Sequence, residues 1–330
     1  MENIDKISVI GAGSWGTTLA VLLGEKGYNV TLWSRREELA KEINKIKENK
    51  KYLKNIEIPE KVIATASMEE AVENSNIIVL TIPSNFLREV TKSVSRFASK
   101  NAIIVHGVKG LEESTGKTMS KVLEDELPNG QEIAVLSGPN HAEEVSKKLP
   151  TATVIASKNK GTSESLCETF GTPYFKPYPH YDVVGVEICG VVKNIVAMAI
   201  GVCRGLKFGD NAKASILTLG LSEMGMIAKE FGAKRITCYG LAGVGDLVAT
   251  CYSSYSRNRF VGEMLAKGKT MDQISKEMGG MIAEGIKNTK IIYDLCVKSG
   301  IEAPLIFQTY KVLYEGVDLR KAIEQLLDRI

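Results

Sequence analysis

The chain has 330 residues, which is more than one ordinary domain needs, so we expect two domains that each bury a core. Its hydrophobic content of 44% and charged content of 25% are those of a globular protein and exclude a disordered chain. The formal net charge of +3, with Lys and Arg spread along the sequence, gives no reason to expect nucleic-acid or membrane binding.

Targeting and metal-binding patterns are not found in the sequence. Polar residues 1–6 run straight into the apolar residues 7–10, without a signal-peptide pattern. The most apolar stretch, 183–202, contains Glu187, Lys193 and Asn194, which favours a buried helix over a membrane span. The six cysteines are scattered, without a CxxC pair, and are expected to be buried and free. These features predict a cytoplasmic protein without a metal.

The first part of the chain alternates short β-branched runs with helical segments. This alternation predicts an α/β fold whose N-terminal domain is a Rossmann-type doubly wound sheet. Several of the runs are apolar almost throughout, as in strands that are covered on both faces. We expect strands at 7–10, 29–33, 62–65, 77–82, 102–106, 133–136 and 151–156, and helices at 17–26, 36–47, 86–98 and 117–127.

The alternation stops near residue 180, where Pro173, Pro177 and Pro179 mark a boundary. We therefore predict a dinucleotide-binding domain over residues 1–180 and an all-α substrate-binding domain over residues 181–330. The segment 183–203 is apolar nearly all round and should run through the middle of the second domain. Further helices are expected at 213–231, 256–267, 271–277, 286–297 and 319–327.

A glycine-rich turn follows the first strand directly and opens the first helix. Gly11, Gly13 and Gly16 form the GxGxxG pattern in the context that the dinucleotide fingerprint requires. The backbone N–H groups at the start of the helix would then face the pyrophosphate. The alternative is a glycine-rich turn without a ligand.

The end of the second strand bears on the choice of cofactor. An NAD-binding chain usually carries Asp or Glu there, but this chain has Arg35 and Arg36. Arginine binds a 2′-phosphate bidentately, so the pair predicts a preference for NADPH/NADP+ over NADH/NAD+. Glu37 and Glu38 lie just beyond and leave use of NAD open. Alternatively, both arginines are solvated residues at a helix start.

Two lysines are candidates for the chemistry. Lys193 is the only cation within the apolar stretch 183–202. Burial there would bring its pKa towards neutrality, as suits an acid/base group. The pattern is equally compatible with a lysine whose side chain reaches solvent. Lys109 follows a strand end, where such sheets bind ligands, although a lysine at this position taken alone is more typical of a solvated turn. Asp246 reads as a helix N-cap or as a partner for Lys193. The polar cluster 256–259 suits a phosphate or a capped helix start.

Seven segments occur together in a characteristic order and spacing: GAGSWGTTLA at 11–20, GVKG at 107–110, SGPNHAEEV at 137–145, EICGVVKNIVAMAIGV at 187–202, GLAGVGDLVATC at 240–251, SRNRFVG at 256–262 and AEGI at 283–286. With them the chain resembles the bacterial NAD(P)-dependent glycerol-3-phosphate dehydrogenases over essentially its whole length. The resemblance implies reversible reduction of dihydroxyacetone phosphate to sn-glycerol 3-phosphate, which supplies glycerophospholipid synthesis.

The resemblance also implies roles for individual residues. Lys193, Lys109 and Asp246 would be catalytic, with Lys193 the proton acceptor in the oxidation direction. The substrate would contact Lys109, Gly138, Asn140, Lys193, Asp246, Ser256, Arg257 and Asn258. The dinucleotide would contact Gly11, Gly13, Ser14, Trp15, Gly16, Arg35, Arg36, Tyr52, Lys109, Ala142, Arg257, Ile282 and Glu284. Asn140 stands where the family usually has Ser or Thr, though an amide also donates and accepts hydrogen bonds.

Two other functions are compatible with parts of the pattern. One is a related dehydrogenase for a β-hydroxyacid or 6-phosphogluconate, against which the segment 256–260 argues. The other is a non-catalytic NADP(H)-binding sensor, which gives no reason for Lys193, Asp246 and Arg257. Three histidines and no HExxH pattern argue against metal catalysis. The implied partners are dihydroxyacetone phosphate and sn-glycerol 3-phosphate, without nucleic acid or a stable membrane association, and the family implies a homodimer.

Overall fold

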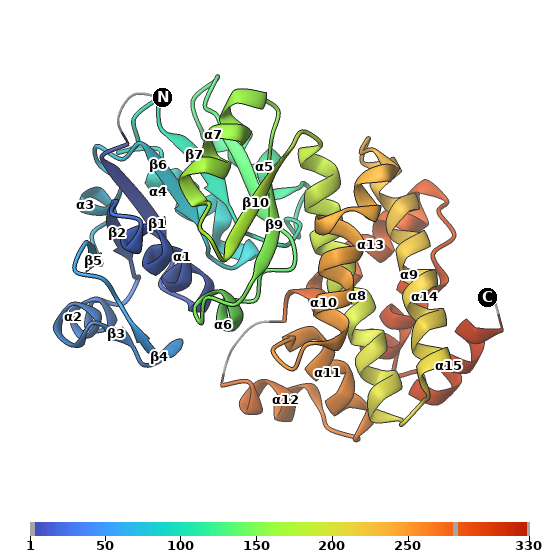
Figure 1. The fold of residues 1–330 in the computed structure, drawn as a ribbon. Helices are drawn as coiled ribbons and strands as arrows, with labels where there is room; N and C mark the ends of the chain where they lie inside the picture. Colours follow the sequence, from blue (N-terminus) through green and yellow to red (C-terminus); the bar gives the residue numbers. More distant parts are fainter. Residues whose placement is uncertain (1–3, 280–282, 329–330) are drawn as a thin grey trace. The chain divides into compact units, whose positions relative to one another are not determined.

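The structure is a computed structural model that describes residues 4–279 and 283–328 (Figure 1). The chain divides into two compact units, Met1–Val108 with Met119–Val183 and Lys109–Thr118 with Val184–Ile330. The division lies three residues beyond the boundary that we expected at residue 180. In addition, the segment Lys109–Thr118 belongs to the second unit rather than to the first.

The first unit is built on an eight-stranded sheet of order β10-β9-β8-β7-β6-β1-β2-β5. Its pairs are parallel except for β8 and β9, which are antiparallel. Parallel neighbours need crossover segments, and helices supply them here. The strands are β1 (Lys6–Ile10), β2 (Asn29–Trp33), β5 (Val62–Thr65), β6 (Ile77–Leu80), β7 (Ile103–His106), β8 (Ile133–Ser137), β9 (Thr151–Ser157) and β10 (Phe175–His180).

Both faces of this sheet are buried. Successive side chains of a strand point to opposite faces, so Val9 joins one core cluster and Ile10 the other. The first cluster packs against α1 (Ser14–Glu25), α2 (Glu37–Ile46) and α7 (Lys160–Phe170). The second packs against α3 (Met68–Val72), α4 (Leu87–Val94) and α5 (Met119–Glu126). The doubly wound Rossmann-type sheet is therefore confirmed.

Two features of the first unit differ from the sequence-based expectation. The proline-rich segment that we took for a boundary contains β10, which lies at the edge of the sheet, where a missing N–H is tolerated. An unexpected hairpin pairs β3 (Glu48–Asn49) with β4 (Leu53–Glu57). The seven expected strands are present, with ends displaced by two residues at most. The remaining short elements are η1 (Ser84–Phe86) and α6 (Ala142–Val145).

The regular elements of the second unit's described residues are all helices, apart from an isolated bridge between Leu111 and Thr118. The expected helices are all present, with ends displaced by three residues at most. The helical segments are α8 (Val183–Gly205), α9 (Asp210–Glu230), η2 (Arg235–Tyr239), the π-helical η3 (Leu241–Gly245), α10 (Asp246–Tyr252), α11 (Arg257–Ala266), α12 (Met271–Glu277), α13 (Glu284–Ser299), α14 (Pro304–Tyr310), the π-helical η4 (Lys311–Glu315) and α15 (Leu319–Leu327).

Helix α8 forms the centre of this unit. Within the described residues it is the one helix long and apolar enough to cross a membrane, but 94% of its apolar window is buried inside the structure. It is therefore a core helix, as its sequence predicted. Gly201 of α8 and Gly262 of α11 face the partner helix so closely that a Cβ on either would overlap partner backbone. All six cysteines are free, as expected, and five of them are buried.

Candidate active site

The glycine turn lies at the carboxyl end of β1, where the strand order switches between β2 and β6. Gly11 has φ +118°, and a Cβ there would lie 2.9 Å from the Thr81 carbonyl oxygen. A Cβ on Gly16 would overlap the Gly11 carbonyl oxygen, so only glycine allows α1 to pack this close. By contrast, a Cβ on Gly13 would have no heavy atom within 4 Å. The backbone at Gly13 is therefore open to a ligand.

The start of α1 suits an anion. Gly13 is its N-cap residue and Ser14 its first residue, and within the described chain no side chain caps this end and no acidic residue lies in the first turn. The free N–H groups and the helix dipole both favour a phosphate at such an end. The residues present thus fit the pyrophosphate of a dinucleotide.

Trp15 lies in the first turn of α1. Its ring packs against Phe175 of β10, with the ring centroids 6.4 Å apart. A Cβ on Gly107 would lie 2.9 Å from the indole nitrogen, so the glycine after β7 leaves room for this ring.

Both arginines after β2 are held against aromatic rings. Arg36 donates a 2.7 Å hydrogen bond to the Tyr52 hydroxyl, and its guanidinium lies 5.5 Å from the centre of the Tyr52 ring. The guanidinium of Arg35 lies 5.6 Å from the centre of the Phe86 ring. Such cation–π contacts orient a guanidinium, whose remaining N–H groups can bind an anion. Arg36 is half-buried, whereas Arg35 is exposed.

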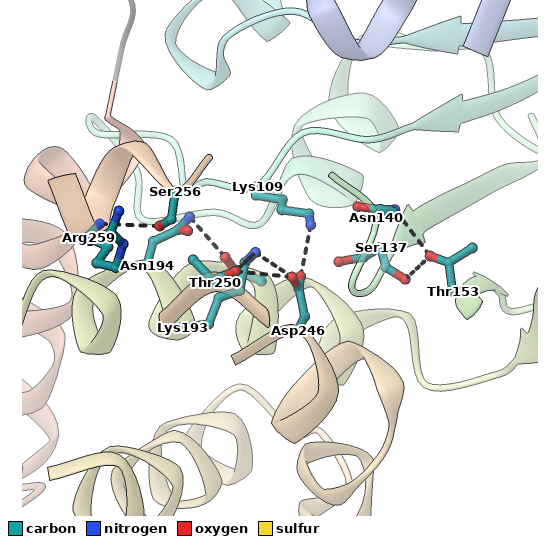
Figure 2. Close-up of polar contacts among 11 residues, drawn as sticks. Lys109, Ser137, Asn140, Thr153, Lys193, Asn194, Asp246, Thr250, Ser256 and Arg259 are labelled. Atoms are coloured by element: carbon teal, nitrogen blue, oxygen red, sulfur yellow. Dashed lines mark hydrogen bonds and ion pairs between the residues drawn. The ribbon is translucent and has the colours of Figure 1, made fainter. Parts of the chain in front are cut away.

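The residues expected to contact the substrate from the first unit lie around Gly138. This glycine has φ +141°, and a Cβ there would lie 2.8 Å from the Thr153 hydroxyl oxygen. The Asn140 amide donates to the same hydroxyl at 3.1 Å, and that hydroxyl donates to the Ser137 carbonyl at 2.8 Å (Figure 2). Ala142 begins α6, and its carbonyl accepts a 3.4 Å hydrogen bond from Thr18 of α1.

A buried cluster of charges lies within the second unit. Asp246, at the start of α10, accepts from Lys193 of α8 at 2.6 Å and from Lys109 at 2.8 Å, each through a different carboxylate oxygen (Figure 2). Lys193 is 4% exposed and Asp246 1% exposed. Lys193 therefore does not reach solvent, and Asp246 is its ion-pair partner as well as the first residue of a helix.

The cluster changes the proton affinities of its members. Burial lowers the pKa of Lys193 to about 7, and the neighbouring Lys109 acts in the same direction, although the Asp246 carboxylate opposes both. Burial alone would raise the pKa of Asp246, but the two ammonium groups outweigh it, so this pKa lies below its ordinary value. Near neutral pH, Asp246 is thus ionised and Lys193 can both give and accept a proton.

Two residues that support this cluster were not found by sequence reasoning. The Thr250 hydroxyl accepts a 2.7 Å hydrogen bond from Lys193 and lies one turn after Asp246 on α10, so the spacing of 246 and 250 was the available signal. Asn288 of α13 accepts from the Leu111 N–H at 3.3 Å and donates to the Lys109 carbonyl at 3.5 Å. Nothing in the sequence around Asn288 links it to Lys109.

The expected phosphate cluster opens α11. Ser256 caps this helix by accepting from the Arg259 N–H at 3.2 Å, and Asn258 accepts from the Gly285 N–H at 3.0 Å. A Cβ on Gly285 would also lie 2.9 Å from the Asn194 carbonyl, so this corner adjoins the turn of α8 that carries Lys193. Arg257 is the first residue of α11 and Glu284 the first of α13, whereas Ile282 lies outside the described residues.

Models of two protein families match the chain. The NAD-dependent glycerol-3-phosphate dehydrogenase N-terminus matches residues 6–163, and the C-terminus of the same enzyme matches residues 182–324. The chain belongs to the NAD-dependent glycerol-3-phosphate dehydrogenase family. As a member it is an oxidoreductase, and the resemblance found in its sequence is confirmed.

Individual proteins agree with this assignment. The glycerol-3-phosphate dehydrogenase [NAD(P)+] of Chlorobium limicola is 44% identical, with 98% of this chain and 97% of that protein covered. The protein of the same name from Clostridium perfringens is 42% identical, with 99% and 98% covered. The crystal structure of glycerol-3-phosphate dehydrogenase from Coxiella burnetii superposes with a TM-score of 0.93 at 39% identity, with 98% of each chain covered.

For this glycerol-3-phosphate dehydrogenase family member, the structure groups the expected residues in part. Lys109, Lys193 and Asp246 contact one another, and Arg36 contacts Tyr52. Asn258 accepts from the N–H of Gly285, the residue that follows Glu284 in α13. The contacts of individual residues with substrate or cofactor stay predictions.

Proposed function

We propose that this chain reduces dihydroxyacetone phosphate reversibly to sn-glycerol 3-phosphate with NADPH or NADH, with Lys193 as the proton-transferring group. The observation that carries this proposal is the buried lysine of near-neutral pKa on Asp246, in a member of the glycerol-3-phosphate dehydrogenase family. Reduction of a carbonyl needs a proton donor and a positive charge near the developing alkoxide, and the cluster offers both.

Each member of the cluster has a distinct part. Lys193 in its ammonium form donates a proton to the carbonyl oxygen, and in its amine form it removes the proton from the hydroxyl in the reverse direction. Two of its three N–H bonds are directed to Asp246 and Thr250, which fixes the Nζ and leaves the third for the substrate oxygen. Lys109, whose side chain is 22% exposed, adds positive charge that steadies the alkoxide.

The nicotinamide cofactor, when bound, supplies or accepts the hydride at the substrate carbon. The glycine turn with Ser14, Trp15 and Gly16 would hold its pyrophosphate. The guanidiniums of Arg35 and Arg36, each in a cation–π contact, suit a 2′-phosphate, so we propose that NADPH is preferred over NADH.

We propose that the substrate phosphate binds at the start of α11. Arg257 offers a guanidinium there, and Asn258 and Ser256 flank it on the first turn. Gly138 and Asn140 would complete the substrate contacts from the first unit. We further propose that the enzyme works in the cytoplasm as a homodimer, without a stable membrane or nucleic-acid partner, and supplies glycerophospholipid synthesis.

A substrate panel tests this proposal. NADPH oxidation is measured with dihydroxyacetone phosphate, its dephosphorylated analogue and a β-ketoacid, and NADP+ reduction is measured with 6-phosphogluconate. We expect turnover with dihydroxyacetone phosphate and a kcat/KM lower by about 100-fold or more for the analogue, because the phosphate contacts are then lost. Preferred turnover of another substrate would identify a related dehydrogenase, and cofactor binding without any turnover would identify a sensor.

A further inference from the structure

Asn49 is a fully buried polar residue next to the glycine turn, at 0% exposure. It lies on β3 of the unexpected hairpin, more than thirty residues from the turn in sequence. Its amide nitrogen donates to the Ala12 carbonyl at 3.0 Å and to the Thr17 hydroxyl at 2.8 Å. Both hydrogens of one amide group are therefore used on the turn and on the first helical turn that follows it.

The bond to Ala12 fixes the direction of a peptide plane. In a trans peptide the C=O and the following N–H point in opposite directions, and the described chain has no cis peptide. Since the Ala12 carbonyl points to Asn49, the Gly13 N–H points away from it. The carbonyl oxygen of this peptide is thereby held on the Asn49 side and the Gly13 N–H on the opposite side. A carbonyl turned to that side would repel a phosphate.

The other end of the amide faces the arginine side of the site. The Asn49 side-chain oxygen accepts from the Tyr52 N–H at 3.2 Å, as does the Asn49 backbone carbonyl. The Tyr52 hydroxyl in turn accepts from Arg36 at 2.7 Å. One side chain thus links the glycine turn to the residue that holds Arg36, and every member of this network lies in the first unit.

We propose that Asn49 is a positioning residue for the dinucleotide, which holds the Ala12–Gly13 peptide and the start of α1 in their phosphate-binding geometry. This inference rests on the proposed function only in taking the glycine turn as the cofactor site. The side-chain hydrogen bonds of Asn49 go to Ala12, Thr17 and Tyr52, so we expect this residue to act on cofactor affinity rather than on the chemical step.

The test measures cofactor dissociation constants for Asn49→Ala without substrate, from quenching of the two tryptophans, Trp15 and Trp33. We expect the constants for NADPH and for NADH both to rise by about tenfold or more, with kcat at saturating cofactor changed by less than about twofold. The milder Thr17→Val change, which removes one of the two acceptors, should raise both constants by a smaller factor.

Asn44→Ala provides the matched control. Asn44 of α2 also bridges two backbone groups, the carbonyl and N–H of Ala64, each at 2.7 Å, but within the described residues it has no hydrogen bond to the turn. It should lower thermal stability and leave both dissociation constants unchanged. A folded Asn49→Ala protein with wild-type constants, or an equal effect in Asn44→Ala, overturns the inference. Failure of the wild-type protein to turn over dihydroxyacetone phosphate would contradict the proposed function instead, because the binding measurement uses no substrate.

Discussion

Replacement of Asp246 by Asn removes the charge that supports protonation of Lys193. The Lys193 Nζ lies 2.6 Å from the carboxylate, and an opposite charge this close changes a pKa by about one to three pH units. Starting from a pKa of about 7, the variant lysine would titrate between about pH 4 and about pH 6. At pH 7 about half of the wild-type lysines carry the proton, against about a tenth or fewer in the variant. We therefore expect kcat for reduction at pH 7 to fall by about fivefold or more.

The direction of the pH dependence follows from the proton that is transferred. Reduction needs protonated Lys193, so its kcat falls as pH rises through the pKa of this lysine, whereas kcat for oxidation rises. The assay follows NADPH oxidation at saturating dihydroxyacetone phosphate from about pH 5 to about pH 9. In Asp246→Asn the falling limb should move to lower pH by about one unit or more.

Asp210→Asn is the control for general electrostatics. Asp210 pairs with Lys213 at 2.6 Å in the same unit, but its carboxylate is 92% exposed. Its removal should leave the pH profile unchanged, because solvent screens an exposed pair. A falling limb at the same pH in wild type and Asp246→Asn would refute the assignment of Lys193 and Asp246. If the falling limb moved equally in Asp210→Asn, the displacement would not depend specifically on Asp246.

Three further predictions concern other parts of the molecule. Lys193→Ala should lower kcat by about 10²–10⁴-fold with an unchanged circular dichroism spectrum, and a folded variant with normal turnover would remove this lysine from its role. Arg35→Glu combined with Arg36→Ala should raise KM for NADPH far more than KM for NADH, whereas equal increases would show that the arginines do not read the 2′-phosphate. The Glu223 carboxylate accepts from two backbone N–H groups of α14. Burial raises the pKa of Glu223 to about 7 from its ordinary 4.5. The free energy of unfolding should therefore fall by about 3 kcal/mol as pH rises from about 4.5 to about 7. Urea unfolding near pH 5 and near pH 8 should show this loss in wild type and not in Glu223→Gln, and an equal loss in both proteins would assign it to other groups.

Much of the fold was predictable because its signals are local. Apolar runs such as Ile77–Leu80 indicate strands covered on both faces, and the all-apolar pattern of α8 indicates a central helix. Elements whose stability comes from distant contacts were missed. Strand β10 is a proline-rich segment that pairs with β9 at the edge of the sheet. The hairpin that contains Asn49 is formed by a lysine-rich segment. Pairing of this kind is not encoded in a short window.

The candidate site was predictable where one motif contains all of its parts. The glycine turn is such a motif, since strand, turn and helix start lie within ten residues. The ionic cluster is not, because Lys109, Lys193 and Asp246 are separated by 53 residues or more. By sequence alone, Lys193 was equally compatible with a solvated side chain, and Lys109 was more typical of one. The structure decides by placing one carboxylate between them. Thr250 and Asn288 could be recognised as supporting residues only from their hydrogen bonds in the structure.

The same cluster shows why its residues act as a group. A lone buried ammonium would lose its proton, and a lone buried carboxylate would gain one, because burial disfavours either charge. Between the two lysines Asp246 stays ionised. Its negative charge raises the pKa of Lys193, whereas the positive charge of Lys109 lowers it. The near-neutral pKa of Lys193 is therefore a property of three side chains. It follows that the effects of single substitutions at 109, 193 and 246 on turnover will not add, since each one changes the ionisation of the groups that remain.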